Sequence, residues 1–184
     1  MGRAVETAQF TAKHLDLPVI PCDFIREIVW APLEGKTIEA NGHLWELSKI
    51  LSSQGVSLAA PNWMKKEPWC DSRIIEDANR VTRGLDELLS ELGYQREGEY
   101  YRVTSNKTDT TIAIFSHAGA STVAMSHLLN IPLPQLCALL PLDYTSITTF
   151  RLSNGKGRLI YPKITTINDA KHIKDILTDN VYGN

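Results

Sequence analysis

The chain has 184 residues, of which 43% are hydrophobic and 22% are charged, and its net charge at pH 7 is −2. This balance is typical of one globular domain and argues against a broad basic surface for nucleic acid. No apolar run is long enough to cross a bilayer, and the three widely spaced cysteines suggest neither a disulfide framework nor a zinc site. We therefore expect a single cytoplasmic domain over residues 1–184, without a metal, a nucleic-acid partner or membrane contact.

The first half of the chain is predicted to be mostly helical. Apolar residues at helical spacing predict a helix over residues 3–15, and "LPVIP" at 17–21 then predicts a short buried strand. A second helix is predicted over 37–53. The clearest helix spans 72–92, where apolar side chains line one face.

Residues 54–71, between these two helices, have no regular period and contain two prolines. We predict a surface excursion that could form a cap or lid over a pocket. The alternative is that its tryptophans, Trp63 and Trp69, anchor the loop on the core, as buried aromatic residues usually do.

The second half of the chain alternates predicted strands and helices. Residues 94–103 are typical of a small hairpin, 110–116 of a buried strand and 120–130 of a helix. Two alternating strands over 145–164 are predicted to turn at the Asn-Gly pair 154–155. Helices alternating with buried strands indicate an α/β layered fold with a mostly parallel sheet, and such sheets bind ligands beyond the carboxyl ends of their strands.

His117 lies at such a strand end, in the stretch Ser116-His117-Ala118-Gly119. The first turn of the helix that follows has unpaired N–H groups and the positive end of the helix dipole. Because Ala118 and Gly119 leave the backbone accessible, an anion could bind there with the imidazole beside it. The alternative is that His117 is only a polar strand end. The remaining histidines lack this context and are interpreted as structural: His14, His43, His127 and His172.

Several segments match a known family pattern in order along the chain. They are "MGRAVETAQFTAKHLDLPV", "FIREIVWAPLEGKT", "IAIFSHAGA" followed by "LLNIP", and "LDYTSITTFRL". Together they resemble the histidine phosphatase superfamily, also called phosphoglycerate mutase-like, which typically has Ser-His-Gly-Gly at the third segment. The resemblance implies a three-layer α/β/α domain with a mostly parallel central sheet.

The resemblance also implies site residues. Arg3 corresponds to the arginine that clamps the phosphoryl oxygens, and His117 to the second histidine, which binds the transferred phosphoryl group. Glu27 corresponds to the proton donor to the leaving oxygen, and Ala118 would offer its backbone N–H to the phosphate. These residue types suit phosphoryl transfer, because arginine is a planar cationic fork and a carboxylic acid can protonate an alkoxide.

Glu34 is the competing acid, and it aligns with a family glutamate that we interpret as structural. Leu33 replaces the family's tryptophan and Ala31 a usual glycine, so we expect this loop to be remodelled. The resemblance implies no metal or other cofactor, because arginine, histidine and backbone dipoles can supply the positive charge.

The family's nucleophile is the histidine of an N-terminal Arg-His-Gly motif, which occurs nowhere in the 184 residues. We therefore expect an N-terminally truncated domain that lacks at least roughly 30 residues, the size of a βαβ unit. The neighbours of the absent strand would close the gap, pair with another chain or stay exposed. This leaves a homo-oligomer open.

Two functions follow from the resemblance. The first is hydrolysis of a small phosphorylated metabolite through a phosphohistidine when the domain is complete, with the 184-residue chain inactive or nearly so. The second is a pseudoenzyme that binds phosphate or a phosphorylated ligand without cleaving it. A weaker alternative is an unrelated α/β protein with accidental matches.

Overall fold

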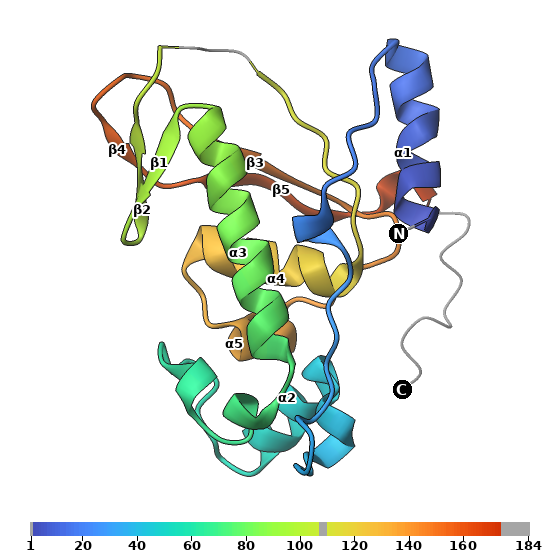
Figure 1. Cartoon of the computed structure of the whole chain (residues 1–184), viewed down its shortest axis with the longest axis vertical. Coiled ribbons are helices and arrows are strands. Elements are labelled where there is room, and N and C mark those ends of the chain that lie inside the picture. The colour runs from blue at the N-terminus through green and yellow to red at the C-terminus, as the bar shows by residue number, and fades with distance from the viewer. Residues whose placement is uncertain (1, 107–109, 174–184) are drawn as a thin grey trace.

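The computed structural model describes residues 2–106 and 110–173 (Figure 1). Its α-helices are α1 (Gly2–Leu15), α2 (Leu44–Ser53), α3 (Ile74–Glu91), α4 (Ala118–Leu129) and α5 (Leu133–Leu139). Its strands are β1 (Tyr94–Glu97), β2 (Tyr100–Val103), β3 (Ile147–Arg151), β4 (Leu159–Ile160) and β5 (Lys163–Asp169). Short 3-10 helices lie at Asp23–Ile25, Glu39–Gly42, Trp63–Lys65, Trp69–Asp71 and Lys171–Ile173.

The predicted helices 3–15, 72–92 and 120–130 are confirmed as α1, α3 and α4, with ends that move by at most two residues. The hairpin predicted over 94–103 is confirmed as β1 and β2, which pair in antiparallel register. The helix predicted over 37–53 is shorter. Ala40 and Asn41 have positive φ angles of 50°, so the chain kinks there and α2 begins only at Leu44.

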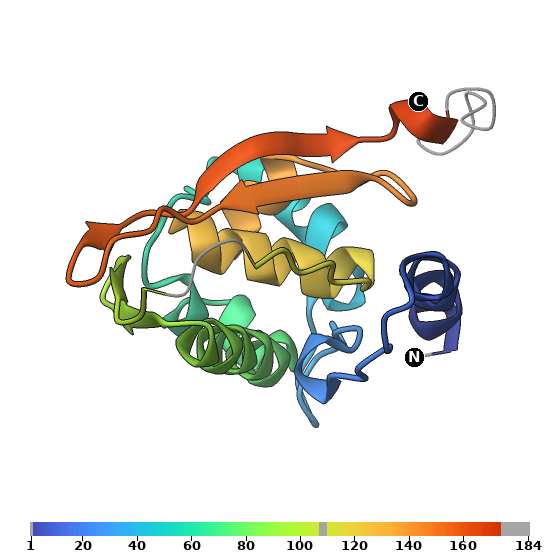
Figure 2. The ribbon, with the colours of Figure 1, turned by 90° about the horizontal axis from the view of Figure 1, so that it is seen from above.

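The layers of the molecule differ from the predicted three-layer α/β/α arrangement. Figure 2 shows α4 in the middle, α3 on one side of it and the ribbon of β3 and β5 on the other. A helix, not a sheet, is therefore the central layer of the described residues. α1 lies to one side; Phe10 on this helix is 81% exposed, and Ala8 is its buried residue.

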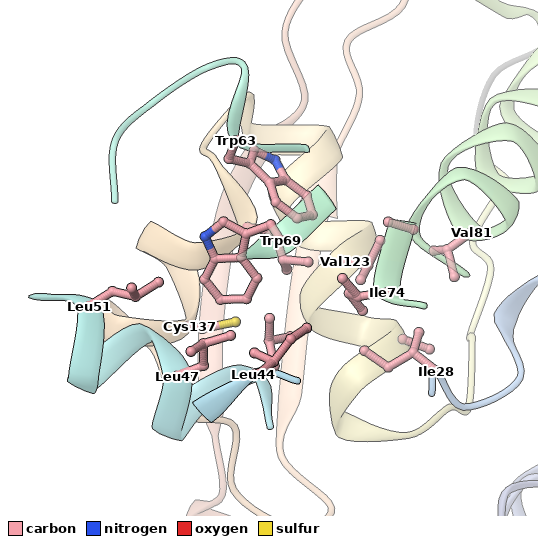
Figure 3. Close-up of a cluster of buried hydrophobic side chains, with 14 of the residues drawn as sticks. Ile28, Leu44, Leu47, Leu51, Trp63, Trp69, Ile74, Val81, Val123 and Cys137 are labelled. Carbon is pink, nitrogen blue, oxygen red and sulfur yellow. The ribbon is translucent and has the colours of Figure 1, made fainter. Parts of the chain in front are cut away.

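The main hydrophobic core lies where α2, α3, α4 and α5 meet (Figure 3). Trp63 and Trp69 belong to it: they are 7% and 3% exposed, and their rings pack edge to face with centroids 5.9 Å apart. These two side chains anchor segment 54–71 on the core. A role for this segment as a lid stays a prediction.

Every strand pairing in the described ranges, 2–106 and 110–173, is antiparallel. One sheet has the order β1-β2-β4 and the other consists of β3 and β5. The prediction of a mostly parallel central sheet is therefore wrong for these residues, and the missing element is the predicted buried strand over 110–116.

Residues 110–116 run outside both sheets, and Ile112 and Ile114 are 44% and 47% exposed. The backbone groups of 110–115 make no hydrogen bond to any residue that the structure describes. The strand predicted at 17–21 is also absent, and its Ile20 is 75% exposed. An apolar run favours a strand, but the strand forms only where a second strand completes the hydrogen-bond ladder.

The late hairpin is paired differently from the prediction. β3 pairs with β5, in a register that places Ile147 opposite Asp169 and Arg151 opposite Lys163. The intervening chain carries β4, which pairs with β2 in the other sheet. The Asn-Gly pair 154–155 thus lies on a long excursion between the sheets rather than at a two-residue hairpin turn.

Candidate functional site

Glu27 meets the first turn of α4. Its Oε1 accepts a hydrogen bond from the backbone N–H of Ala120 at 3.0 Å and another from the N–H of Ile28 at 3.0 Å. Ala120 is a first-turn residue of α4, whose N–H has no partner within the helix. A carboxylate at a helix N-terminus is also favoured by the helix dipole. The side chain predicted to be the acid therefore lies at the predicted anion site.

His117 is the N-cap residue of the same helix. Its backbone is extended, with φ −111° and ψ 161°, and its carbonyl accepts the N–H of Ser121 at 2.9 Å. The imidazole is half-buried and makes no hydrogen bond within the part of the chain that the structure describes. The preceding Ser116 donates its hydroxyl to the carbonyl of Ile25 at 2.8 Å. This bond ties the His117 segment to the loop that carries Glu27, so the two candidates lie at one end of α4.

Gly119 makes room for a segment of the chain itself. A Cβ built there would lie 2.5 Å from Ile28 Cγ1 and 2.7 Å from Glu27 Oε1. Glycine is thus required by the protein's own loop, which packs against α4 where an anion was expected to approach. Ala118 is exposed, and its backbone N–H donates to none of the described residues.

Arg3 lies in the first turn of α1 and is exposed. Its guanidinium makes no hydrogen bond or ion pair with residues 2–106 or 110–173. In Figures 1 and 2 the N-terminal end of α1 lies on the side of the molecule where α4 begins. Among the described residues, hydrogen bonds bring Glu27 and the His117 segment together, but no hydrogen bond or ion pair adds the Arg3 guanidinium to them.

Sequence reasoning missed the face of α3 that holds the Glu27 loop. Asp77 Oδ2 accepts the backbone N–H of Val29 at 2.6 Å. At Gly84 an added Cβ would lie 2.1 Å from Phe24 Cβ, so only glycine lets the loop pack against the helix there. Two features of the α3 sequence could have indicated this packing. Asp77 is an acidic residue on the apolar face of the helix, and Gly84 is a glycine in the middle of the helix, where glycine is unfavourable without a packing reason.

Glu34, the competing acid, is exposed on the loop before α2 and makes no hydrogen bond or ion pair with another described residue. Two surface hollows lie beside β5 and next to α2, and neither is lined by Glu27 or His117. Within the described residues no group of three or more histidine, cysteine, aspartate or glutamate side chains could hold a metal ion.

His127, on α4, takes part in a polar network. Its Nε2 lies 2.9 Å from Asp86 Oδ1 on α3, and the hydroxyl of Tyr101 donates to the same oxygen at 2.7 Å. Burial raises the pKa of Asp86, but the bonds from His127 and Tyr101 lower it further, so that the pKa lies below its ordinary value. Burial and Asp86 together raise the pKa of Tyr101. The network joins α3, α4 and β2, which agrees with a structural role for His127.

Comparison with known families identifies the class of protein. The model of the histidine phosphatase superfamily (branch 1) matches residues 1–165. The chain therefore belongs to the histidine phosphatase superfamily, whose members have an α/β fold. Searches of curated proteins and of solved structures give no match. In the described part of the chain no helix is both long and apolar enough to span a membrane.

Proposed function

We propose that this chain binds the phosphate group of a small phosphorylated metabolite at the N-terminus of α4, as part of a phosphomonoesterase. The observation that carries the proposal is the meeting of Glu27 with the turn that follows His117. Three features support phosphate binding: a His117 imidazole and an Ala118 N–H that make no hydrogen bond with the described residues, and the positive end of a helix dipole.

Glu27 suits the role of proton donor. Oε1 is held by two backbone N–H groups, whereas Oε2 makes no hydrogen bond with the described residues and is free to carry a proton. A carboxylic acid in this position is the kind of group that donates a proton to a leaving alkoxide. Arg3, exposed and unpaired among the described residues, would clamp the phosphoryl oxygens.

The described site does not supply the nucleophile of the proposed reaction. In the proposed reaction a histidine attacks phosphorus and becomes phosphohistidine, but the sequence has no Arg-His-Gly motif. We propose that His117 cannot replace it, because a residue that binds the flank of a phosphate is not in line with the leaving group. The 184-residue chain should therefore bind phosphate and turn over little or no substrate. The same observation favours the pseudoenzyme as the second candidate function.

We also propose a cytoplasmic location. The cysteines are all free in the structure, one of them buried: Cys22, Cys70 and Cys137. Unpaired cysteines are usual in reducing compartments.

The test combines binding and turnover. Inorganic phosphate is titrated by ³¹P NMR against the wild type, His117→Ala and, as a control, His14→Ala on the exposed end of α1. Loss of a charge-assisted hydrogen bond should weaken binding by about 10- to 100-fold in His117→Ala only. Hydrolysis of p-nitrophenyl phosphate should stay at background. Strong turnover that His117→Ala abolishes would contradict the proposal that His117 cannot replace the nucleophile. Equal phosphate binding by all three proteins would show that the phosphate site does not include His117.

A further inference from the structure

Arg80, on α3, binds the main chain of the loop that carries Glu27. Its side chain is 14% exposed, and its guanidinium donates to carbonyl oxygens on both sides of Arg26. Nη1 donates to Asp23 O at 3.0 Å, Phe24 O at 2.7 Å and Arg26 O at 3.3 Å, and Nη2 donates to Arg26 O at 3.3 Å and Glu27 O at 3.4 Å. One planar fork thus fixes the loop at four carbonyl groups between Asp23 and Glu27.

Asp77 completes this arrangement. Its Oδ1 accepts from Arg80 Nε at 3.0 Å and Nη2 at 2.7 Å, while Oδ2 accepts the N–H of Val29. The ion pair of Asp77 and Arg80 is nearly buried. It holds the loop carbonyls before Ile28 through Arg80 and the N–H of Val29 through Asp77. The Asp77 side chain is 12% exposed. The loop has no long regular element of its own, so its position depends on these contacts.

We propose that Arg80, oriented by Asp77, is a positioning residue that holds the Glu27 carboxylate against the first turn of α4. The step to catalysis rests on the proposed function, in which Glu27 donates the proton. Arg80 acts through the backbone, since its hydrogen bonds go to Asp77 and to carbonyls of residues 23–27. Placement of an acid to within a fraction of an ångström is what a proton transfer requires.

Lysine should not substitute for this arginine. An ammonium group is a compact point charge, whereas the guanidinium presents a rigid fork that reaches several acceptors at once. Arg80→Lys keeps the positive charge beside Asp77 and loses most of the carbonyl contacts. It therefore separates the positioning role from the charge of the buried pair.

The experiment measures backbone amide exchange by ¹⁵N NMR on the full chain without any ligand. Arg80→Lys is compared with Arg83→Lys, a matched control on the same helix whose Nε bonds only Asn79 O of its own helix, at 3.2 Å. Loss of most of the hydrogen bonds from Arg80 to the loop carbonyls should speed exchange at Ala120 and Ile28 by about tenfold or more in Arg80→Lys only. Triple-resonance assignment identifies the Ala120 and Ile28 amides, both of which donate to Glu27 Oε1.

Amides in the middle of α3, such as that of Leu85, report global stability. If they exchange faster by the same factor as Ala120, Arg80 only stabilises the fold and the proposal fails. It fails too if Ala120 stays as protected in Arg80→Lys as in the wild type. Since no phosphate is present, the result is independent of the proposed function. If Arg80→Lys speeds amide exchange but the wild type binds no phosphate, the proposed function is wrong and the positioning role of Arg80 still holds.

Discussion

At the scale of single residues, the close approach between Gly119 and the Glu27 loop constrains the site directly. The sequence showed that small residues follow His117, but it could not show what they make room for. Two partners explain a small residue equally well: a ligand, or another segment of the chain. The three-dimensional contact shows that Gly119 makes room for Ile28 and Glu27 of the chain itself.

The substitution Gly119→Ala tests this constraint. The new methyl group would overlap Ile28 and Glu27, so the loop must move away from α4. We expect a loss of about 1–3 kcal/mol in the free energy of unfolding, the usual cost of overpacking. Urea denaturation measures it, with Gly2→Ala as the matched control, since a Cβ at Gly2 meets only Glu6 Oε1, at 3.8 Å. Equal stability of the two variants would contradict the contact.

The charged residues of α3 show why the sequence revealed only part of the site. His117 and Glu27 stand out because they lie in short, recognisable motifs. Asp77 and Arg80 resemble an ordinary exposed i,i+3 ion pair, which contributes little to stability. Their side chains are 12% and 14% exposed instead, because a loop some 50 residues earlier folds over them. No local pattern contains that information.

At the scale of elements, the main helices and the local hairpin of β1 and β2 were predictable, whereas strands that pair over a long distance in the sequence were not. A helix closes its hydrogen bonds within itself, so apolar spacing alone located α1, α3 and α4. A strand needs a neighbour, and the apolar runs at 17–21 and 110–116 have none in the described chain. The residues of β4 lie in a stretch that was predicted to be a strand, but their partner is the edge of β2 and not β3.

The bond between His127 on α4 and Asp86 on α3 predicts how these elements respond to pH. The pKa of Asp86 is lowered in the folded state from an ordinary value of 3.8. The ionised Asp86 carboxylate therefore contributes fully to the free energy of unfolding above about pH 4, and this contribution is lost as the pH falls through the lowered pKa. Asp86→Asn should reduce the free energy of unfolding at pH 7 by about 1–3 kcal/mol, and by less at acid pH.

Urea denaturation between pH 2 and 7 measures this effect. Glu87→Gln, an exposed neighbour on the same helix, is the control and should change stability little. The structural reading of the network also requires Tyr101→Phe to lower stability, because its hydroxyl donates to Asp86. If Asp86→Asn were as stable as the wild type at pH 7, the network would not hold α3 to α4.

At the scale of the whole molecule, the helical core is complete while the sheet is not. α2 to α5 bury their apolar faces against one another (Figure 3). The segment over 110–115, by contrast, exposes isoleucines and makes no backbone hydrogen bond to the described residues. A segment with exposed apolar side chains, whose backbone N–H and C=O groups pair with no strand, is a surface on which another chain can form a strand pairing.

We therefore expect the chain to self-associate through residues 110–115. This segment has no charged side chain, so two copies could lie antiparallel without like charges opposite each other. Sedimentation velocity should show a weight-average mass that rises with concentration. The double substitution Ile112→Lys and Ile114→Lys should weaken the association by about tenfold or more, since lysine on an edge opposes strand pairing. Leu139→Lys, at a 66% exposed position on α5, is the control. A wild type that stays monomeric, or an equal effect of the control, would show that these residues are not the interface.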